Sequence, residues 1–74
     1  MAKKGDTGVY RVTEVIGTST NSWEDAARNA VQTAAGTLRS LRIAEVTKLD
    51  MRLDDAGKVV QFRARVSLSF KYEG

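Results

Sequence analysis

The chain has 74 residues, of which 42% are hydrophobic and 28% charged, and its formal net charge is +3 at neutral pH. This length allows one domain that buries only about 60% of its unfolded surface, so disulfides, a metal or oligomerisation usually add stability. Because cysteine and histidine are absent, disulfides, ordinary zinc sites and histidine-based catalysis are excluded. Oligomerisation, or a hard cation on carboxylates, therefore remains as the source of stability.

The first residues form a polar segment. Residues 1–7 contain Lys3, Lys4 and Asp6, and we interpret them as a flexible leader before a single domain over residues 8–74. The leader has no apolar signal core, and no apolar run approaches the roughly 20 residues that span a bilayer. We therefore expect a cytoplasmic protein without membrane contact.

The first strand is predicted over residues 9–16, VYRVTEVI, because β-branched and aromatic residues dominate it. Tyr10, Val12 and Ile16 share one face, which we interpret as the apolar face of the strand. Glu14 interrupts that face. An acid in this position is typical of a strand end or of a salt bridge at an interface.

A loop is predicted over residues 17–21, GTSTN, and a helix follows it to residue 39. Asn21 or Ser22 can cap this helix, with an acidic residue three positions on. An amphipathic stripe at i, i+3, i+4 spacing comprises Trp23, Ala26, Ala27, Ala30, Val31, Ala34 and Leu38. Most of the stripe is alanine, so the helix can approach a sheet closely. Within it, we expect Trp23 to pack in the core or an interface.

Two further strands are predicted over residues 43–53 and 59–72, joined by the turn residues Asp54, Asp55, Ala56 and Gly57. The last strand alternates regularly: one face carries Val60, Phe62, Ala64, Val66, Leu68, Phe70 and Tyr72, and the other carries Gln61, Arg63, Arg65, Ser67, Ser69 and Lys71. The fold class is therefore α+β, with the order β-α-β-β and a three-stranded antiparallel sheet on one helix.

The lengths of these elements predict an oligomer. A helix of about 18 residues spans roughly 27 Å, whereas a strand of about 14 residues reaches roughly 46 Å. One narrow, alanine-lined helix cannot cover so long a sheet. The remaining apolar face must therefore meet another subunit.

The order of these segments resembles the dodecin family. The resemblance rests on YRVTEVIGTS from Tyr10, the alanine-rich helix, Ala44-Glu45-Val46 and VSLSF from Val66, and it covers residues 9–72. It implies a sheet curled around one helix and twelve subunits that form a hollow sphere. Members of the family bind flavins in pairs near threefold axes and sequester them without catalysis.

Both flavin-contacting positions of that family differ in this chain. In flavin-binding dodecins, the residue before the Ala-Glu-Val or Phe-Glu-Val segment is a tryptophan that stacks on the isoalloxazine, and here it is Ile43. A glutamine that hydrogen-bonds the flavin corresponds to Arg63. Isoleucine offers no flat π face, and arginine lacks an acceptor carbonyl. With Arg65, which shares the strand face, these residues form the predicted ligand pocket, and the two arginines are either a solvated face or contacts for an anion.

The chain also resembles the calcium dodecin branch of actinobacteria. The similar stretches are TSTNSWE from Thr18, Ala26-Ala27, Ala30-Val31, Asp50-Met51, Asp54, Ala56-Gly57-Lys58 and Val66-Ser67. This resemblance implies a dodecamer with bound calcium and weak or absent flavin affinity. For the metal we consider the carboxylates of Glu14, Glu45 and Asp50, with symmetry bringing copies together. The aspartates at 50, 54 and 55 lack the spacing of an EF-hand loop, which favours a solvated turn.

Three functions stay open. The first is a non-enzymatic, homododecameric binding or storage protein for calcium, and the second is a flavin dodecin that sequesters riboflavin or FMN. The third is a small basic nucleic-acid-binding module, although the body carries only 10 basic and 8 acidic residues without a basic run. An enzyme is not expected, because no histidine can activate the many serines and threonines.

Overall fold

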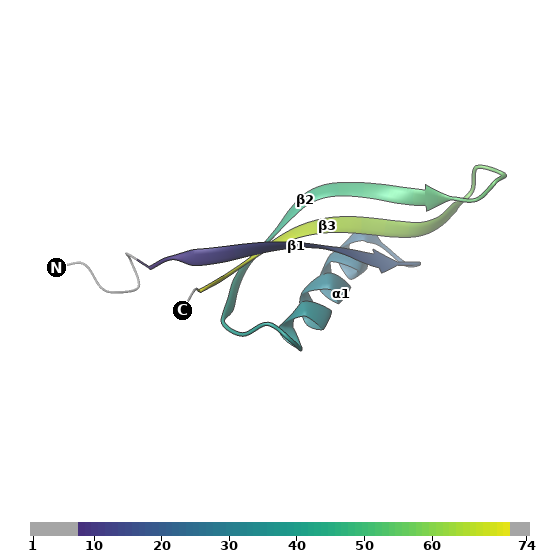
Figure 1. Cartoon of the computed structure of the whole chain (residues 1–74). Coiled ribbons are helices and arrows are strands. Elements are labelled where there is room, and N and C mark those ends of the chain that lie inside the picture. Colours follow the sequence, from purple (N-terminus) through teal and green to yellow (C-terminus); the bar gives the residue numbers. More distant parts are fainter. Residues whose placement is uncertain (1–7, 72–74) are drawn as a thin grey trace.

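The computed structural model describes residues 8–71, so the leader predicted over residues 1–7 and Tyr72 lie outside the described part of the chain. It contains β1 (Tyr10–Ser19), α1 (Trp23–Ala35), β2 (Leu41–Leu53) and β3 (Val59–Lys71). The strands form one antiparallel sheet in the order β1-β3-β2, with α1 against one face (Figure 1). The predicted α+β class and β-α-β-β order are confirmed.

The first strand is longer than its sequence indicated. Residues 17–19 were predicted as loop, but they continue β1 and lie opposite Ala64, Arg63 and Phe62 of β3. The prediction was wrong because small polar residues favour turns locally, whereas the long central strand offers them partners. Gly17 is buried where the helix crosses, and a Cβ atom there would lie 2.0 Å from the carbonyl oxygen of Ala26.

Tyr10, Val12, Glu14 and Ile16 share one face of β1, as predicted, but this face is not the one that packs on the helix. Tyr10, Val12 and Ile16 are 43%, 61% and 45% exposed, and they lie on the sheet face away from α1. The face toward the helix instead carries half-buried Val15 and, beyond it, buried Gly17 and Ser19. The helix lies so close to β1 that only small side chains fit between them. The more hydrophobic face of the strand is therefore not the face that packs on the helix.

The start of α1 follows the predicted capping pattern. Ser22 is the N-cap, and its hydroxyl accepts a hydrogen bond of 3.0 Å from the Asp25 N–H. The buried Ser19 hydroxyl donates to the Asp25 carboxylate at 2.7 Å and accepts from the Asn21 N–H at 2.8 Å. These bonds join the end of β1 to the first turn of the helix.

The helix ends at Ala35, four residues before the predicted end. Gly36 caps it, and the N–H groups of Thr37 and Leu38 both donate to the carbonyl of Ala34, which closes a tight final turn. The amphipathic pattern nevertheless continues in space, because Leu38 still packs against the core from the segment after the helix.

The core is thin and lies between α1 and the central strand. Ala26, Ala30 and Ala34 of the helix pack against Ala64, Val66 and Leu68 of β3, and all six are buried. The predicted alternation of β3 is confirmed by this set. No helix in the described residues is long and apolar enough to cross a membrane.

The second strand lies largely outside this core. Every residue of β2 after Leu41 is exposed, including Val46, Leu49 and Met51 on the side toward the helix. A helix of 13 residues spans about 20 Å, whereas strands of 13 residues reach roughly 43 Å. The β2–β3 hairpin therefore extends beyond the helix (Figure 1).

The hairpin turn is closed by one aspartate, as the sequence predicted for a solvated turn. The Asp54 carboxylate accepts hydrogen bonds from the N–H groups of Ala56 and Lys58 at 2.8 and 3.0 Å. Gly57 has a φ of +80°, which a side chain would strain.

The close contact of Gly17 with the helix generates a stability prediction. We expect Gly17→Ala to lower the free energy of unfolding by about 3 kcal/mol, the upper range for inserting a methyl group into a packed core. The new Cβ atom would collide with the Ala26 carbonyl and would lie 2.7 Å from the Ala30 Cβ. Denaturant unfolding followed by circular dichroism measures the change.

Gly36→Ala is the matched control for this substitution. The nearest atom to a Cβ at this position is the Thr33 carbonyl oxygen at 3.3 Å, so the unfolding free energy should change by about 1 kcal/mol or less. Equal stability of the two variants would show that Gly17 does not set the distance between helix and sheet.

Candidate functional site

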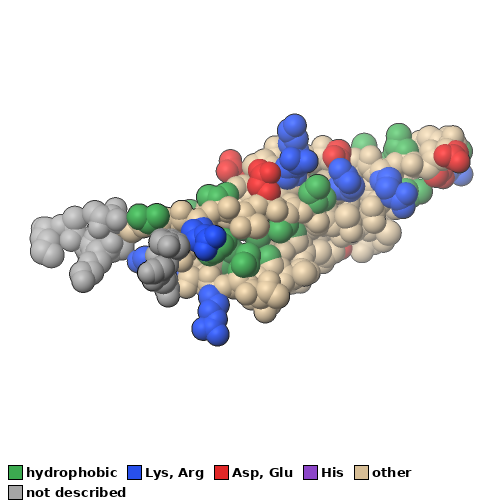
Figure 2. Space-filling model, in the orientation of Figure 1, with side chains coloured by type: hydrophobic (Ala, Val, Ile, Leu, Met, Phe, Trp, Pro, Cys, Tyr) green, Lys and Arg blue, Asp and Glu red, His purple; other side chains and the backbone are tan. Residues whose placement is uncertain are grey.

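The predicted ligand and metal residues all lie on one surface, the sheet face away from α1, which we name the outer face. Its members are Tyr10, Val12, Glu14, Ile16 and Thr18 of β1, Gln61, Arg63, Arg65, Ser67, Ser69 and Lys71 of β3, and Ile43, Glu45, Lys48, Asp50 and Arg52 of β2. Figure 2 shows acidic and basic side chains mixed over the sheet on the side in view. The structure thus brings the six predicted residues to one face.

Irregularities in β2 determine which of its residues reach the outer face. Leu41 lies opposite Phe70 and packs against the core, but the next pair is Ile43 with Ser69, so the register shifts by one residue. Side chains alternate along a regular strand, and Leu41 and Ile43 would otherwise share a face. The shift places Ile43 on the outer face, where it is 57% exposed.

A second bulge in β2 lies at Thr47. Val46 is opposite Val66 on the side of the helix, and Lys48 is already opposite Arg65 on the outer face. The Thr47 hydroxyl donates to the Arg65 carbonyl at 3.2 Å. Our sequence reasoning missed this bulge. The signal was present in the spacing of three between the apolar residues Val46 and Leu49, where a regular strand has two.

This second bulge brings Asp50 opposite Arg63, and the two side chains form an ion pair. The Arg63 Nε and Nη2 atoms donate to the two carboxylate oxygens of Asp50 at 2.7 and 3.1 Å. The hydrogen bond from Arg63 is the main cause that lowers the pKa of Asp50, and it raises the pKa of Arg63. Arg63, which the resemblance predicts to replace the family glutamine, is thus engaged by an acid.

The other arginine of the central strand turns toward β1. The Arg65 Nη1 atom lies 3.8 Å from the Glu14 carboxylate, and both side chains are about half exposed. Glu14 and Glu45 lie opposite the same residue, Ser67, from the two edge strands. The two glutamates therefore flank the middle of the sheet, while Asp50 lies further along it.

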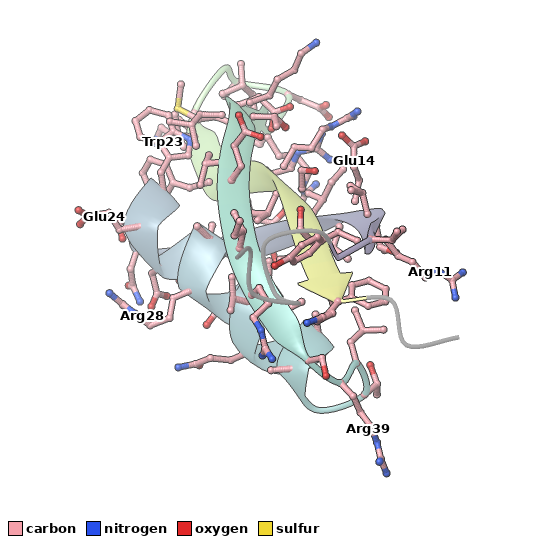
Figure 3. All side chains as sticks on the ribbon, turned by 90° about the vertical axis from the view of Figure 1, so that its left-hand side faces the viewer. Arg11, Glu14, Trp23, Glu24, Arg28 and Arg39 are labelled. Carbon is pink, nitrogen blue, oxygen red and sulfur yellow. The ribbon has the colours of Figure 1, made fainter. Side chains whose placement is uncertain are left out.

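Trp23 lies on the opposite side of β2 from this ion pair. Its ring packs edge-on against Phe62, with centroids 5.2 Å apart, and its indole N–H donates to the Asp50 carbonyl at 3.0 Å. Figure 3 shows Trp23 and Glu14 on different sides of the protein. Trp23 packs against another aromatic side chain, but it is only half-buried and lies outside the core cluster. The sequence did not predict the hydrogen bond of Trp23, which fixes the backbone of β2 at Asp50.

The described protomer does not enclose the predicted ligand pocket. One groove of about 670 Å³ lies between β1 and α1 and is lined by residues such as Thr13, Asn29, Thr33 and Leu38. A smaller hollow of about 400 Å³ lies beside Glu14, Ile16 and Arg65. Neither hollow is lined by Ile43 or Arg63, so a bound ring at these positions would need walls from another copy.

The acidic residues of the outer face have the oxygen ligands that a hard cation prefers, but one protomer brings too few of them together. Calcium takes six to eight oxygen ligands, and the outer face offers carboxylates, which suit it. Within residues 8–71, no three acidic side chains gather into a group that could hold a metal. Asp50 is the weakest of the three predicted ligands, because both its oxygens accept from Arg63. Glu14 and Glu45 fit better, provided that several copies contribute.

Comparison with known proteins agrees with the resemblance seen in the sequence. The Dodecin family model matches residues 9–73. Calcium dodecin of Mycobacterium tuberculosis is 46% identical over 63 residues, which are 85% of this chain and 87% of that protein. The predicted likeness to calcium dodecin is confirmed.

Solved structures show the same fold. Dodecin from Streptomyces coelicolor superposes with a TM-score of 0.83 at 41% identity, over 92% of this chain and 96% of that one. The crystal structure of calcium dodecin from M. tuberculosis, described as a calcium-chelating immunodominant antigen with a novel calcium-binding site, gives a TM-score of 0.77 at 45% identity, over 88% and 91%. Sequence, topology and structural match agree that the chain belongs to the dodecin family.

Proposed function

We propose that this dodecin is a non-enzymatic binding or storage protein that assembles as a hollow homododecamer, holds calcium between its subunits and has little affinity for flavin. The observation that carries the proposal is the exposed second strand, on which apolar side chains lie uncovered on one face and carboxylates on the other. A cytoplasmic location, without membrane or nucleic-acid partners, stays a prediction from the sequence.

The apolar side of β2 supports the assembly. Val46, Leu49 and Met51 are 46%, 51% and 43% exposed although they point to the side on which the helix lies. β2 is also an edge strand in the sheet of residues 8–71, where no described strand pairs with its other side. Contiguous apolar surface beside an open edge is typical of an interface, and a second copy of this chain would cover both.

The distribution of carboxylates supports calcium at such an interface. Calcium is part of the name of the M. tuberculosis relative. In one protomer Glu14 and Glu45 lie on the two edge strands, where neighbouring copies would meet. Glu45 has no ion pair within the described residues, so its carboxylate is available. A cation shared between copies would offset the repulsion of pooled carboxylates.

Weak flavin affinity follows from the two changed positions. Ile43 is aliphatic and exposed, so it offers surface but no ring for stacking. Arg63 cannot accept a hydrogen bond, and Asp50 already engages its Nε and Nη2 atoms. The alternative, a flavin dodecin that sequesters riboflavin or FMN, would need a ring partner from elsewhere in the shell.

Removal of calcium tests the proposal. We expect a chelator to lower the thermal stability of the assembly, since a ligand at 100 times its Kd stabilises the state that binds it by about 2.7 kcal/mol. Differential scanning calorimetry with size-exclusion chromatography, before and after chelation and after calcium is restored, measures the effect. If neither melting temperature nor size responds, calcium is not part of the structure.

The ligand role of Glu45 has its own control. Glu45→Gln removes one carboxylate of the outer face and should abolish most of the stabilisation by calcium. Glu24→Gln makes the same chemical change on α1, on the other side of the protein from Glu14 (Figure 3), and should keep the response. An equal response in both variants would exclude Glu45 as a ligand.

Restoring the two family residues tests the account of the flavin site. We expect the unmodified protein to be colourless and to quench riboflavin fluorescence weakly. Ile43→Trp with Arg63→Gln should tighten binding by roughly 5- to 150-fold, the range for one stacked ring. Titration of riboflavin fluorescence measures this, with each single substitution as a control. Tight quenching by the unmodified protein would instead support the flavin dodecin.

A further inference from the structure

Two basic side chains lie directly opposite each other on the outer face. Lys48 of β2 and Arg65 of β3 are register partners, and cross-strand partners have Cβ atoms about 5 Å apart. Like charges in this position destabilise a sheet. A sequence that only needed a solvated surface would gain stability from an acid or a neutral residue at either position.

The bulge at Thr47 creates this pair. In a regular strand Lys48 would share the side of Val46 and point toward the helix. The extra residue moves Lys48 to the outer face, and the hydrogen bond of 3.2 Å from the Thr47 hydroxyl to the Arg65 carbonyl fastens the bulge to the residue that Lys48 faces. Bulges are used in this way to aim side chains next to functional sites.

Neighbouring acids engage the pair only in part. Arg65 forms an ion pair with Glu14, with 3.8 Å between Nη1 and the carboxylate, which is too long for a hydrogen bond. Lys48 forms no ion pair within the described residues. Its nearest acid along the strand, Asp50, uses both oxygens on Arg63, although Lys48 and Arg65 each contribute to lowering the pKa of Asp50. One Lys ammonium and most of the Arg65 donors thus remain available.

We propose that Lys48 and Arg65 together bind a phosphate group, as the free ion or as a phosphomonoester. A guanidinium can donate two parallel hydrogen bonds to phosphate oxygens, and a lysine on the facing strand adds a mobile positive charge. The hollow of about 400 Å³ beside Arg65, Glu14 and Ile16 leaves room for the group that carries the phosphate. This inference goes beyond the proposed calcium site, because its residues are basic and cannot be ligands of calcium.

Calorimetric titration with inorganic phosphate tests this proposal, in buffer freed of calcium by a chelating resin because calcium phosphate precipitates. We expect saturable binding by the unmodified protein. Lys48→Gln should weaken it roughly fivefold, which is the upper range for one exposed charge pair. Lys58→Gln, on the hairpin turn, makes the same change in net charge away from the outer face and should leave the affinity unchanged.

A third variant separates geometry from charge. Thr47→Val removes the hydroxyl that fastens the bulge without altering net charge, and it should also weaken phosphate binding. An absence of saturable binding in the unmodified protein, or an equal loss in Lys48→Gln and Lys58→Gln, would overturn the site. The response to calcium, measured on the same variants, should persist in Lys48→Gln, so failure here is distinct from failure of the proposed function.

The source of the phosphate follows from a second titration with phenyl phosphate. Tighter binding than that of inorganic phosphate would identify a phosphomonoester whose apolar body enters the hollow by Ile16. Equal binding would identify the free ion as the ligand. In both cases, Lys48→Gln should also weaken the binding of phenyl phosphate. Unchanged affinity in that variant would contradict the proposal.

Discussion

The close approach of a short helix to a long sheet is the constraint on which this protein depends. Gly17 and the alanines of α1 let the helix pack directly on β1 and β3, and the core is consequently thin and confined to their contact. Since α1 spans about half the length of the strands, the described residues give β2 and the hairpin almost no cover. This geometry is the basis for the proposed assembly of several copies, in which neighbours would complete the candidate ligand sites.

The irregular second strand then decides the chemistry of the outer face. Two register shifts turn Ile43, Lys48 and Asp50 away from the helix, and each meets a different partner on β3. Asp50 forms an ion pair with Arg63, while Lys48 lies opposite Arg65, which carries the same charge. The face therefore combines Arg63, held by two hydrogen bonds to Asp50, with the neighbouring basic pair of Lys48 and Arg65, of which Arg65 has a longer contact with Glu14. Trp23, on the other side of β2, stabilises this arrangement, because its indole N–H donates a hydrogen bond to the carbonyl of Asp50.

Local patterns in the sequence were sufficient for the elements and for the family. The alternation of β3 predicted the buried Val66 and Leu68, and Ser22 predicted the start of the helix. The ends of β1 and α1 were not predictable in the same way. Strand pairing with β3 overrode the turn preference of residues 17–19, and a tight turn after Gly36 kept Leu38 in the core outside the helix.

The shared sheet face of the candidate residues was predictable, but their partners were not. Resemblance located Ile43 and Arg63, and simple chemistry located the carboxylates. Which acid holds which arginine depends on the bulge at Thr47, a property of two strands in register rather than of one segment. The exposure of the apolar face of β1 in one protomer has a similar cause. From their hydrophobicity, Tyr10, Val12 and Ile16 resemble core residues. The helix instead packs on the other face of β1, where Gly17 permits its close approach.

Native mass spectrometry of the freshly purified protein tests the central claim most directly, because one spectrum gives both the number of subunits and any retained ligand. The uncovered face of β2 predicts a single species of twelve subunits with bound calcium and no flavin. A folded monomer at micromolar concentration would contradict the account, since it would show that the thin core between α1 and β3 is stable without other copies.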